Sequence, residues 1–365
     1  MSNLFFRTNI APYRIDTYNT LHKKLGCEMY FYWQQDTSQN FNEKGMVKSC
    51  HFTPHYLNGI RLGKQSRKMC TDVWKILKEN KPEIVIVPEF QILTIQVLLY
   101  KFLYRKKFKI ISMCDDSYDM VANNNDFTLV HKLARKLIAP IVDDILLVDS
   151  RVKDWYQTNY GKGIWLPIIR DEKNEENRYR LTLPISQSYV EKFKLQGKKV
   201  LLYVGRFDVV KNLDTLINAI NKCNEDFITI FVGSGAQENY LREQASKCKK
   251  EIIFAGHYVD DEVRAWYNVG DVFILPSKQE AFGAVTNEAL IAGCKCLISE
   301  KAGSACLIDG KNGKQLNPNN PDSMAQMIDE FMTQITVRKE ITQRPMQMNI
   351  TFDETLDKVI QAIIS

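Results

Sequence analysis

Residues 271–293, DVFILPSKQEAFGAVTNEALIAG, place an apolar run, a polar loop and a helical pattern in immediate succession. The run 271–277 is short and contains β-branched and aromatic residues, which is typical of a strand covered on both faces of a parallel sheet. A helix is expected over 284–292, because the glycine that follows is a common helix stop. A strand, a loop and a helix in this order predict a layer of parallel α/β structure. Glu280 then lies in the loop, and Glu288 lies about one turn inside the helix.

The same alternation extends in both directions along the chain and predicts an α/β fold of two doubly wound domains. Patterns of buried strands occur at 83–89, 108–115 and 143–150, and then from 199, 227, 251 and 295. The charge-dense segment 170–180, RDEKNEENRYR, interrupts this rhythm and is the expected linker. The predicted parts are an N-terminal domain over 1–180 with the linker at about 170–185, a C-terminal domain over 181–345, and a closing helix over 346–365 that could pack back on the first domain.

The composition is that of an ordinary soluble protein, with 45% apolar and 25% charged residues. No apolar run reaches the roughly 18 residues of a membrane-spanning helix, and the first residues, MSNLFFRTNIAPYR, have too short an apolar run for a signal peptide. The nine cysteines are scattered without a paired CxxC spacing, which indicates reduced thiols. We therefore expect a cytoplasmic protein.

The net charge of +6 is concentrated in the first half of the chain. Residues 1–180 hold 28 Lys and Arg against 20 Asp and Glu, whereas residues 181–365 hold 21 against 23. A basic half favours an anionic partner, such as a phospholipid surface, a lipid diphosphate or nucleic acid, although a solvated basic face explains it equally well. The segment 100–109, YKFLYRKKFK, joins aromatic and cationic side chains as a peripheral membrane contact or a nucleic-acid patch does. An amphipathic core helix with a basic end is the alternative.

Glycine use points to an anion-binding loop in the second half. Six of the 17 glycines precede residue 197, and phosphate-binding loops need glycine so that backbone N–H groups can approach the anion. A predicted strand ends at Gly205, Arg206 follows, and Lys211 opens a helix, so two cations meet at a strand end where ligands of α/β sheets collect. The two cations suit a departing diphosphate, and surface cations at a turn are the alternative. The Gly-Ser-Gly at 233–235 is a weak nucleotide fingerprint, and a tight turn explains it as well.

Glu280 and Glu288 could form an acid/base pair, but the two carboxyl groups of a hydrolase must flank one bond at a defined distance. Two carboxylates on different local structures are better suited to hold different hydroxyls of one extended ligand, since a carboxylate accepts hydrogen bonds from both hydroxyls of a diol. An anion held by the backbone N–H groups of 283–286 would lie between them. These residues alone leave both uses open.

Several motifs stand in a fixed order between residues 199 and 320. They are Gly205-Arg206 with Lys211, Phe254-Ala-Gly256, Pro276-Ser277 with Glu280-Ala-Phe-Gly283, Glu288-Ala289 with Gly293, and Asp309-Gly310-Lys-Asn312-Gly313. Together they resemble the retaining, nucleotide-sugar-dependent glycosyltransferases of family 4, the glycosyl transferases group 1. The resemblance implies a GT-B architecture of two facing Rossmann-like domains, in which the first binds the acceptor and the second binds the donor.

The resemblance also implies roles for individual residues. Arg206 and Lys211 would bind the donor diphosphate and stabilise it as it leaves, and Glu280 would hold hydroxyls of the transferred sugar. The other donor-binding residues would be Gly205, Phe282, Gly283 and the amides of Val285 and Thr286 around the sugar and phosphates, Glu288 on the ribose, and Gly256 and His257 at the edge of the base. A solvent-facing loop position is the alternative for His257.

The first domain matches the family less well, because 7–21, RTNIAPYRIDTYNTL, lacks the glycines that many relatives carry after the first strand. Arg14 in this loop and Glu89 at a strand end are candidates for the acceptor side of the site. Where many relatives carry a histidine near the reacting carbon, this chain has Asp115 and Asp116, which could orient the acceptor hydroxyl or the donor sugar, or form only a polar strand exit. We expect no metal site there, since cationic side chains already neutralise the diphosphate.

The resemblance therefore predicts a hexosyltransferase-type enzyme that moves a sugar from a nucleotide diphosphate sugar to an acceptor hydroxyl with retention of anomeric configuration. The donor would be a UDP- or GDP-sugar, with no cofactor. The acceptor would be a saccharide or a lipid-linked saccharide in cell-surface polysaccharide or lipid-linked oligosaccharide synthesis, at the inner face of an anionic membrane and without nucleic acid. The alternatives are a nucleotide-sugar epimerase or hydrolase on the same fold, and a non-catalytic nucleotide-sugar-binding partner subunit.

Overall fold

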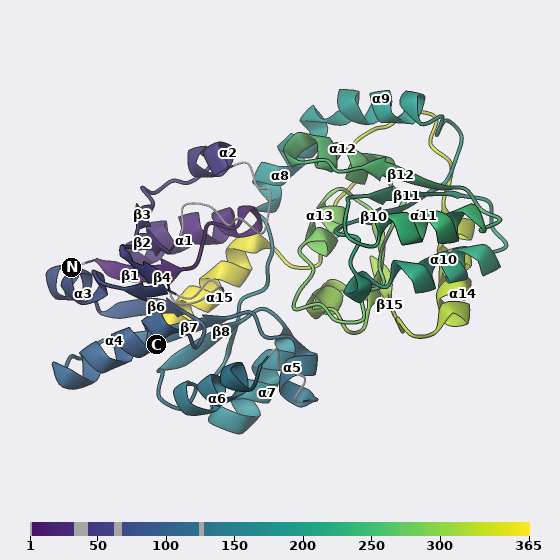
Figure 1. Ribbon diagram of the computed structural model, residues 1–365. Helices are drawn as coiled ribbons and strands as arrows, with labels where there is room; N and C mark the ends of the chain where they lie inside the picture. The colour runs from purple at the N-terminus through teal and green to yellow at the C-terminus, as the bar shows by residue number, and fades with distance from the viewer. Residues whose placement is uncertain (1, 33–42, 62–67, 124–127) are drawn as a thin grey trace. The chain divides into compact units, whose positions relative to one another are not determined.

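The computed structural model describes residues 2–32, 43–61, 68–123 and 128–365, and it divides into two compact units (Figure 1). The first unit comprises Met1–Ile169 together with Asp353–Ser365, and the second comprises Arg170–Phe352. Each unit is built on a parallel β-sheet covered by helices. The predicted α/β class with parallel sheets is therefore confirmed.

The first unit contains a parallel sheet in the order β3-β2-β1-β6-β7-β8-β9 and a separate antiparallel pair, β4 and β5. The strands are β1 (Asn3–Arg7), β2 (Cys27–Phe31), β3 (His55–Tyr56), β4 (Gly59–Arg61), β5 (Lys68–Cys70), β6 (Ile84–Pro88), β7 (Lys109–Cys114), β8 (Asp144–Leu147) and β9 (Ile164–Trp165). The helices are η1 (Pro12–Arg14), α1 (Ile15–Leu25), α2 (Glu43–Lys48), α3 (Val73–Asn80), α4 (Ile92–Leu103), α5 (Tyr118–Ala122), α6 (Leu129–Ile138), α7 (Ser150–Tyr160) and the C-terminal α15 (Phe352–Ile364).

One hydrophobic cluster covers a single face of this sheet. It joins inward residues of β1, β6, β7 and β8 to residues of α3, α4, α6 and α7, so these four helices lie on the same side. Helix α15, yellow in Figure 1, also belongs to the first unit, although almost the whole second unit precedes it in the sequence. The Lys109 ammonium donates to the carbonyls of Ile363 and Ile364, and Lys24 pairs with Asp357. These contacts hold the end of the chain against β7 and α1.

The second unit contains a parallel sheet in the order β12-β11-β10-β13-β14-β15. Its strands are β10 (Val200–Val204), β11 (Ile228–Val232), β12 (Ile252–Gly256), β13 (Val272–Leu275), β14 (Lys295–Ser299) and β15 (Gly313–Leu316). Its helices are α8 (Glu172–Leu181), α9 (Leu183–Lys192), η2 (Val209–Lys211), α10 (Leu213–Lys222), α11 (Glu238–Ser246), α12 (Asp260–Val269), α13 (Val285–Ile291), η3 (Gly303–Leu307) and α14 (Pro321–Gln334). Every residue of β10, β11 and β13 is buried, as strands covered on both faces require.

The segment 170–180, which the sequence predicted as a linker, is helix α8 and belongs to the second unit. The Asp171 carboxylate caps this helix by accepting hydrogen bonds from the amides of Lys173 and Asn174. Glu175 on its inner face is only 2% exposed and is ion-paired with arginines. The charges that suggested a linker therefore stabilise a buried helix contact.

The order of strands reverses at one point in each sheet. In the first unit the chain passes from β1 to β2 on one side and later to β6 on the other. In the second unit β10 is followed by β11 on one side, and β13 occupies the other. The crevice at the carboxyl ends of such strand pairs is where open α/β sheets bind ligands. The loops after β1 and β6, and those after β10 and β13, are thus the places to look for function.

Candidate functional site

The loop after β10 presents the first predicted cation. Arg206 follows Gly205, and its side chain is 74% exposed and pairs with Asp208 at 3.1 Å. The Tyr203 hydroxyl donates to the Arg206 carbonyl at 2.9 Å, which holds the turn from beneath. The Arg206 backbone is therefore held by a buried tyrosine, while its guanidinium lies mostly in solvent.

Lys211 and Glu280 meet between the loops that follow β10 and β13. Their side chains form an ion pair, and both are largely shielded from solvent. The loops are tied to each other, since the Lys278 amide donates to the Val210 carbonyl at 2.9 Å. Asn212, fully buried and with a positive φ of 61°, donates to the carbonyl of Pro276 at 3.1 Å. The sequence placed both charged residues at this edge, but it did not single out Asn212, which connects the loops beneath them.

The backbone around Gly283 is held in one conformation. Gly283 has a φ of 91°, and a Cβ there would lie 2.7 Å from the Leu275 side chain and 3.1 Å from the Ser304 hydroxyl. The Ser304 amide donates to the backbone carbonyl of Phe282 at 2.7 Å, and the Gly303 amide donates to the backbone carbonyl of Glu280 at 3.2 Å. Phe282 itself is buried, so in this structure it supports the loop from below.

Helix α13 begins at Val285, and its seven residues make it shorter than the expected 284–292. The Thr286 amide donates to the Gly283 carbonyl at 3.0 Å, and the Thr286 and Ser304 hydroxyls share a hydrogen bond of 2.8 Å. The Thr286 amide is thus engaged within the protein.

Glu288 lies on α13 and accepts a hydrogen bond of 2.8 Å from the Tyr267 hydroxyl. Burial raises the pKa of Glu288 above its ordinary value, while Arg170, Tyr267 and Arg264 act in the opposite direction. The Tyr179 hydroxyl donates to the Glu288 carbonyl at 3.0 Å. Glu280 and Glu288 therefore have different partners, one a lysine and the other a tyrosine, as expected of two separate contacts more than of an acid/base pair.

The Gly-Ser-Gly of residues 233–235 supports the cation loop by backbone contact. A Cβ at Gly233 would lie 1.9 Å from the Gly205 carbonyl oxygen, and one at Gly235 would lie 2.6 Å from the backbone of Phe207. The Gly233 amide donates to the carbonyl of Gly256 at 2.8 Å. These glycines allow neighbouring loops to touch, which neither a nucleotide fingerprint nor a simple turn describes. His257, after Gly256, is exposed.

In the first unit, a cluster of charges occupies the carboxyl ends of β1 and β7. The two oxygens of Asp115 accept from Arg7 and Arg14, each at 2.5 Å. Burial alone would raise the pKa of Asp115, but the charges of Arg14 and Arg7 outweigh it and hold that pKa below its ordinary value. Arg7, the last residue of β1, was missed by the sequence; the strand-end rule that selected Glu89 would also have selected it.

Asp116 is buried beside this cluster and serves the interior of the unit. Its carboxylate accepts from the Tyr156 hydroxyl at 2.7 Å and from Arg135 at 3.2 Å, and His131 lies 3.6 Å away. Only 2% of the residue is exposed. Of the two predicted aspartates, Asp115 is the one that solvent can reach.

Glu89 follows β6 in a backbone conformation that non-glycine residues rarely adopt, with a φ of 43°. Its carbonyl accepts from the hydroxyls of Thr94 at 3.0 Å and Ser112 at 2.9 Å, and its amide donates to Met113 at 3.0 Å. Burial raises the pKa of the Glu89 carboxyl. Strain of this kind collects at functional sites and must be held by its surroundings.

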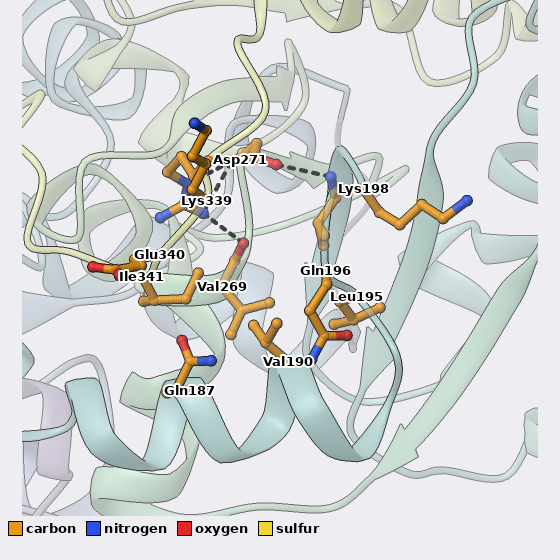
Figure 2. A pocket seen from close by; sticks show the side chains of 12 residues that line it. Gln187, Val190, Leu195, Gln196, Lys198, Val269, Asp271, Lys339, Glu340 and Ile341 are labelled. Carbon is orange, nitrogen blue, oxygen red and sulfur yellow. Dashed lines mark hydrogen bonds and ion pairs between the residues drawn. The ribbon is translucent and has the colours of Figure 1, made fainter.

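The larger hollows of the second unit lie along α10 and α11: one holds about 360 Å³, and another of about 230 Å³ includes Asp208 in the loop after β10. Among the described ranges, no group of three or more His, Cys, Asp or Glu residues could hold a metal ion. The pocket in Figure 2 lies at the amino ends of β10 and β13, the opposite edge of the second sheet, and holds about 20 Å³, room for little more than one water molecule. There Arg338 donates to the Val269 carbonyl at 2.8 Å and pairs with Asp271, so these groups are already satisfied within the protein.

Residues 198–334 match the family model described as glycosyl transferases group 1. An uncharacterised glycosyltransferase of Methanocaldococcus jannaschii is 31% identical over 149 residues, which are 40% of this chain and 38% of that protein. The chain spans about two fifths of the length of the first curated relatives it matches.

Solved structures resemble the whole chain. The Anabaena protein HepE, in complex with UDP and glucose, superposes with a TM-score of 0.73 and 15% identity and covers 100% of this chain and 98% of its own. WaaG, a glycosyltransferase involved in lipopolysaccharide biosynthesis, gives 0.62 and 16%, covering 100% and 95%. Such low identities show the fold alone, which is the GT-B fold of these neighbours. Residues 198–334 therefore resemble the glycosyl transferases group 1 family, on a chain with the GT-B fold.

Proposed function

We propose that this protein is a glycosyltransferase that moves a sugar from a nucleotide diphosphate sugar to an acceptor hydroxyl, with retention of anomeric configuration. The observation that carries the proposal is the ion pair of Lys211 and Glu280 at the carboxyl edge of the second sheet, with Arg206 exposed in the loop after β10. A cation and a carboxylate held side by side match the two ends of the bond that breaks, the diphosphate and the sugar.

The cations would act on the diphosphate. Within the part of the chain that the structure describes, Lys211 donates to one oxygen, that of Glu280, and an ammonium carries three protons, so it can bind phosphate without leaving Glu280. Arg206 would add a second, planar contact after parting from Asp208. Together they would stabilise the negative charge that develops as the nucleotide diphosphate leaves.

The proposed retention rests on the engagement of Glu280, the carboxylate that the loop after β13 presents at this edge. Glu280 is ion-paired with Lys211, so its carboxylate is already engaged by a cation and is suited to accept further hydrogen bonds from sugar hydroxyls. The departing phosphate oxygen would then take the acceptor proton on the face from which it left. Positioning by the two loops would supply the remaining rate enhancement.

The donor would be a UDP-sugar in the first instance, with a GDP-sugar as the alternative. Glu288, held by Tyr267, would accept hydrogen bonds from the ribose hydroxyls. UDP is favoured because the neighbour HepE was crystallised with UDP and with UDP-glucose. No further cofactor is included in this proposal, since the cations account for the diphosphate charge.

The first unit would bind the acceptor, a saccharide or a lipid-linked saccharide in the synthesis of a cell-surface polysaccharide or a lipid-linked oligosaccharide at the cytoplasmic face of a membrane. Its support is the cluster of Arg7, Arg14 and Asp115 beside the strained Glu89. Paired charges and a carboxylate that burial keeps poorly solvated are the groups that orient sugar hydroxyls.

The test compares transfer by the wild-type protein with that by Glu280→Gln and Lys211→Ala. Each should lower turnover by roughly 100-fold or more, the range found when one group that stabilises a transition state is removed. Lys278→Ala is the matched control, because this lysine lies exposed in the same loop. NMR of the product from the wild-type protein should show the donor's anomeric configuration.

Three results would overturn the proposal. Near-normal turnover in both variants would remove the site assignment. Consumption of donor without a transfer product would favour an epimerase or hydrolase. Binding of donor without any turnover, with every acceptor class supplied, would favour a non-catalytic subunit.

A further inference from the structure

Helix α6 carries its most apolar row on the outside of the first unit. This α6 row consists of Leu129, Val130, Leu133 and Leu137, with Ile141 beyond the helix end. Its members are between 57% and 80% exposed. The inward face of the helix instead holds the buried Arg135, bound to Asp116, and Ile138. A surface helix ordinarily turns its apolar side inward, so packing within the unit does not account for this row.

Helix α4 bears a second exposed row on the same side of the sheet. This α4 row consists of Ile95, Leu99, Phe102, Leu103 and Tyr104, and Phe102 is 81% exposed. The two helices contribute to one core cluster and so face away from the same side of the sheet (Figure 1). Lys101 near the end of α4 pairs at 2.8 Å with Asp143, which lies two residues after Ile141. The ends of the two rows are therefore neighbours, and we name them together the α4/α6 surface.

Positive charges border both rows. They are Arg105, Lys106 and Lys107 after α4, and Lys132 and Lys136 on α6, and all five are exposed. In the ranges that the structure describes, none of them is ion-paired. No Asp or Glu occurs in 92–109 or in 128–142. Long cationic side chains beside leucines can lay their stems on an apolar phase and keep their charges in its polar boundary.

We propose that the α4/α6 surface rests on an anionic lipid bilayer, with its apolar rows in the headgroup boundary and its cations on lipid phosphates. The sequence pointed only to the cationic end of α4; the larger part of the surface is the α6 row, which the structure reveals. No helix of the described residues is long and apolar enough to cross a bilayer, so the contact is peripheral.

Charge favours lipid over a second copy of the chain as the occupant. Two copies joined through this surface would bring their bordering cations together, which costs free energy, and the nearby Asp143 is already paired with Lys101. An anionic bilayer offers phosphates to every cation and hydrocarbon to every leucine at once. The contact does not depend on the transfer reaction, since it involves neither the loops after β1 and β6 nor the second unit.

The experiment is vesicle co-sedimentation of the full chain. One set of vesicles is pure phosphatidylcholine, and the other contains about one third phosphatidylglycerol. The wild-type protein should bind the anionic set, bind the neutral set far more weakly, and dissociate as the salt approaches about 1 M, where charges are screened within about 3 Å. Absence of binding to the anionic vesicles, or equal binding to both, would overturn the proposal.

Variants then locate the contact. Leu133→Gln with Leu137→Gln, and separately Lys132→Gln with Lys136→Gln, should each weaken the partition by roughly tenfold or more. Leu181→Gln is the control, because Leu181 is 67% exposed on α8 of the second unit and should change nothing. Wild-type partition in both double variants contradicts the proposal. So does a wild-type dimer in sedimentation that the leucine variant abolishes, which would make a second copy the occupant.

Discussion

Glu175→Gln tests whether the buried charge cluster of α8 holds the second unit together. The carboxylate accepts from Arg170 at 2.7 Å, from Arg264 at 2.9 Å and from Arg178 at 3.0 Å. A glutamine keeps the shape but removes the carboxylate charge that the two buried guanidiniums share, although Arg264 keeps its ion pair with the exposed Asp261 at 3.0 Å. Removing one partner of a buried ion pair costs about 3–5 kcal/mol. The half-exposed Arg178 adds little, because solvent screens its charge.

The pKa of Glu175 also predicts how the destabilisation by Glu175→Gln changes with pH. Burial alone would raise the pKa of Glu175, but Arg170 and Arg264 outweigh it and hold the pKa below its ordinary 4.5. A lowered pKa contributes stability that is present above the unfolded value and is lost as the pH falls through the folded value. The difference in unfolding free energy between the wild-type protein and Glu175→Gln should therefore be largest above about pH 5 and should narrow in more acidic solution.

The assay is pulse-labelled hydrogen exchange in urea, read by mass spectrometry on peptides of α8 and α12. This readout isolates the second unit, which matters because a chain of two units need not unfold in one step. Glu176→Gln is the matched control, since Glu176 is the exposed neighbour and loses the same charge. If the free energies of unfolding of Glu175→Gln and Glu176→Gln differ by less than about 1 kcal/mol, the charge cluster does not stabilise the second unit.

Three further predictions follow from the site. Tyr267→Phe removes the hydrogen bond to Glu288, so the pKa of the Glu288 carboxyl should rise further. Calorimetric titration should then show nucleoside diphosphate binding weakened about fivefold, and the loss of binding in acid should begin at a higher pH than in the wild-type protein. Unchanged binding would contradict the role of this pair. Gly233→Ala drives a Cβ into the Gly205 carbonyl, so the melting temperature and nucleotide binding should fall together, whereas Ser234→Ala should keep both. Asp115→Asn removes the carboxylate charge that pairs with the buried Arg7 and Arg14. Hydrogen exchange in β1 peptides should then show that the free energy of unfolding of the first unit falls by about 3–5 kcal/mol, and native-like protection of these peptides would refute this prediction.

Local patterns were enough to predict the sheet of the second unit and the place of Lys211 and Glu280. Apolar runs such as 200–204 and 272–275 are buried on both faces, and their composition records that burial directly. The cation and the carboxylate each follow such a run, so the strand-end rule put them at one edge. Their individual roles with a ligand stay predictions, as do those of the other donor residues.

Contacts between distant residues were not predictable in the same way. The segment 170–180 looked like a linker because its charges are dense, yet Glu175 is buried through Arg264, which is 89 residues away. The ion pair of Asp115 likewise depends on Arg7, which lies 108 residues earlier in the sequence. The sequence also did not show that the α6 row faces solvent, because helical spacing reveals an apolar row but not whether it faces the core or the surface.

The most direct test of the central claim is a thermal-shift panel of UDP, GDP, ADP and CMP on the wild-type protein, Lys211→Ala and Lys278→Ala. A ligand at 100 times its dissociation constant stabilises a protein by about 2.7 kcal/mol, which raises the melting temperature of a unit of this size by several degrees. We predict that UDP or GDP gives such a shift in the wild-type protein and in Lys278→Ala, and that Lys211→Ala loses most of it. Equal shifts in all three proteins, or no shift with any nucleoside diphosphate, would contradict a donor site built on Lys211 and Glu280.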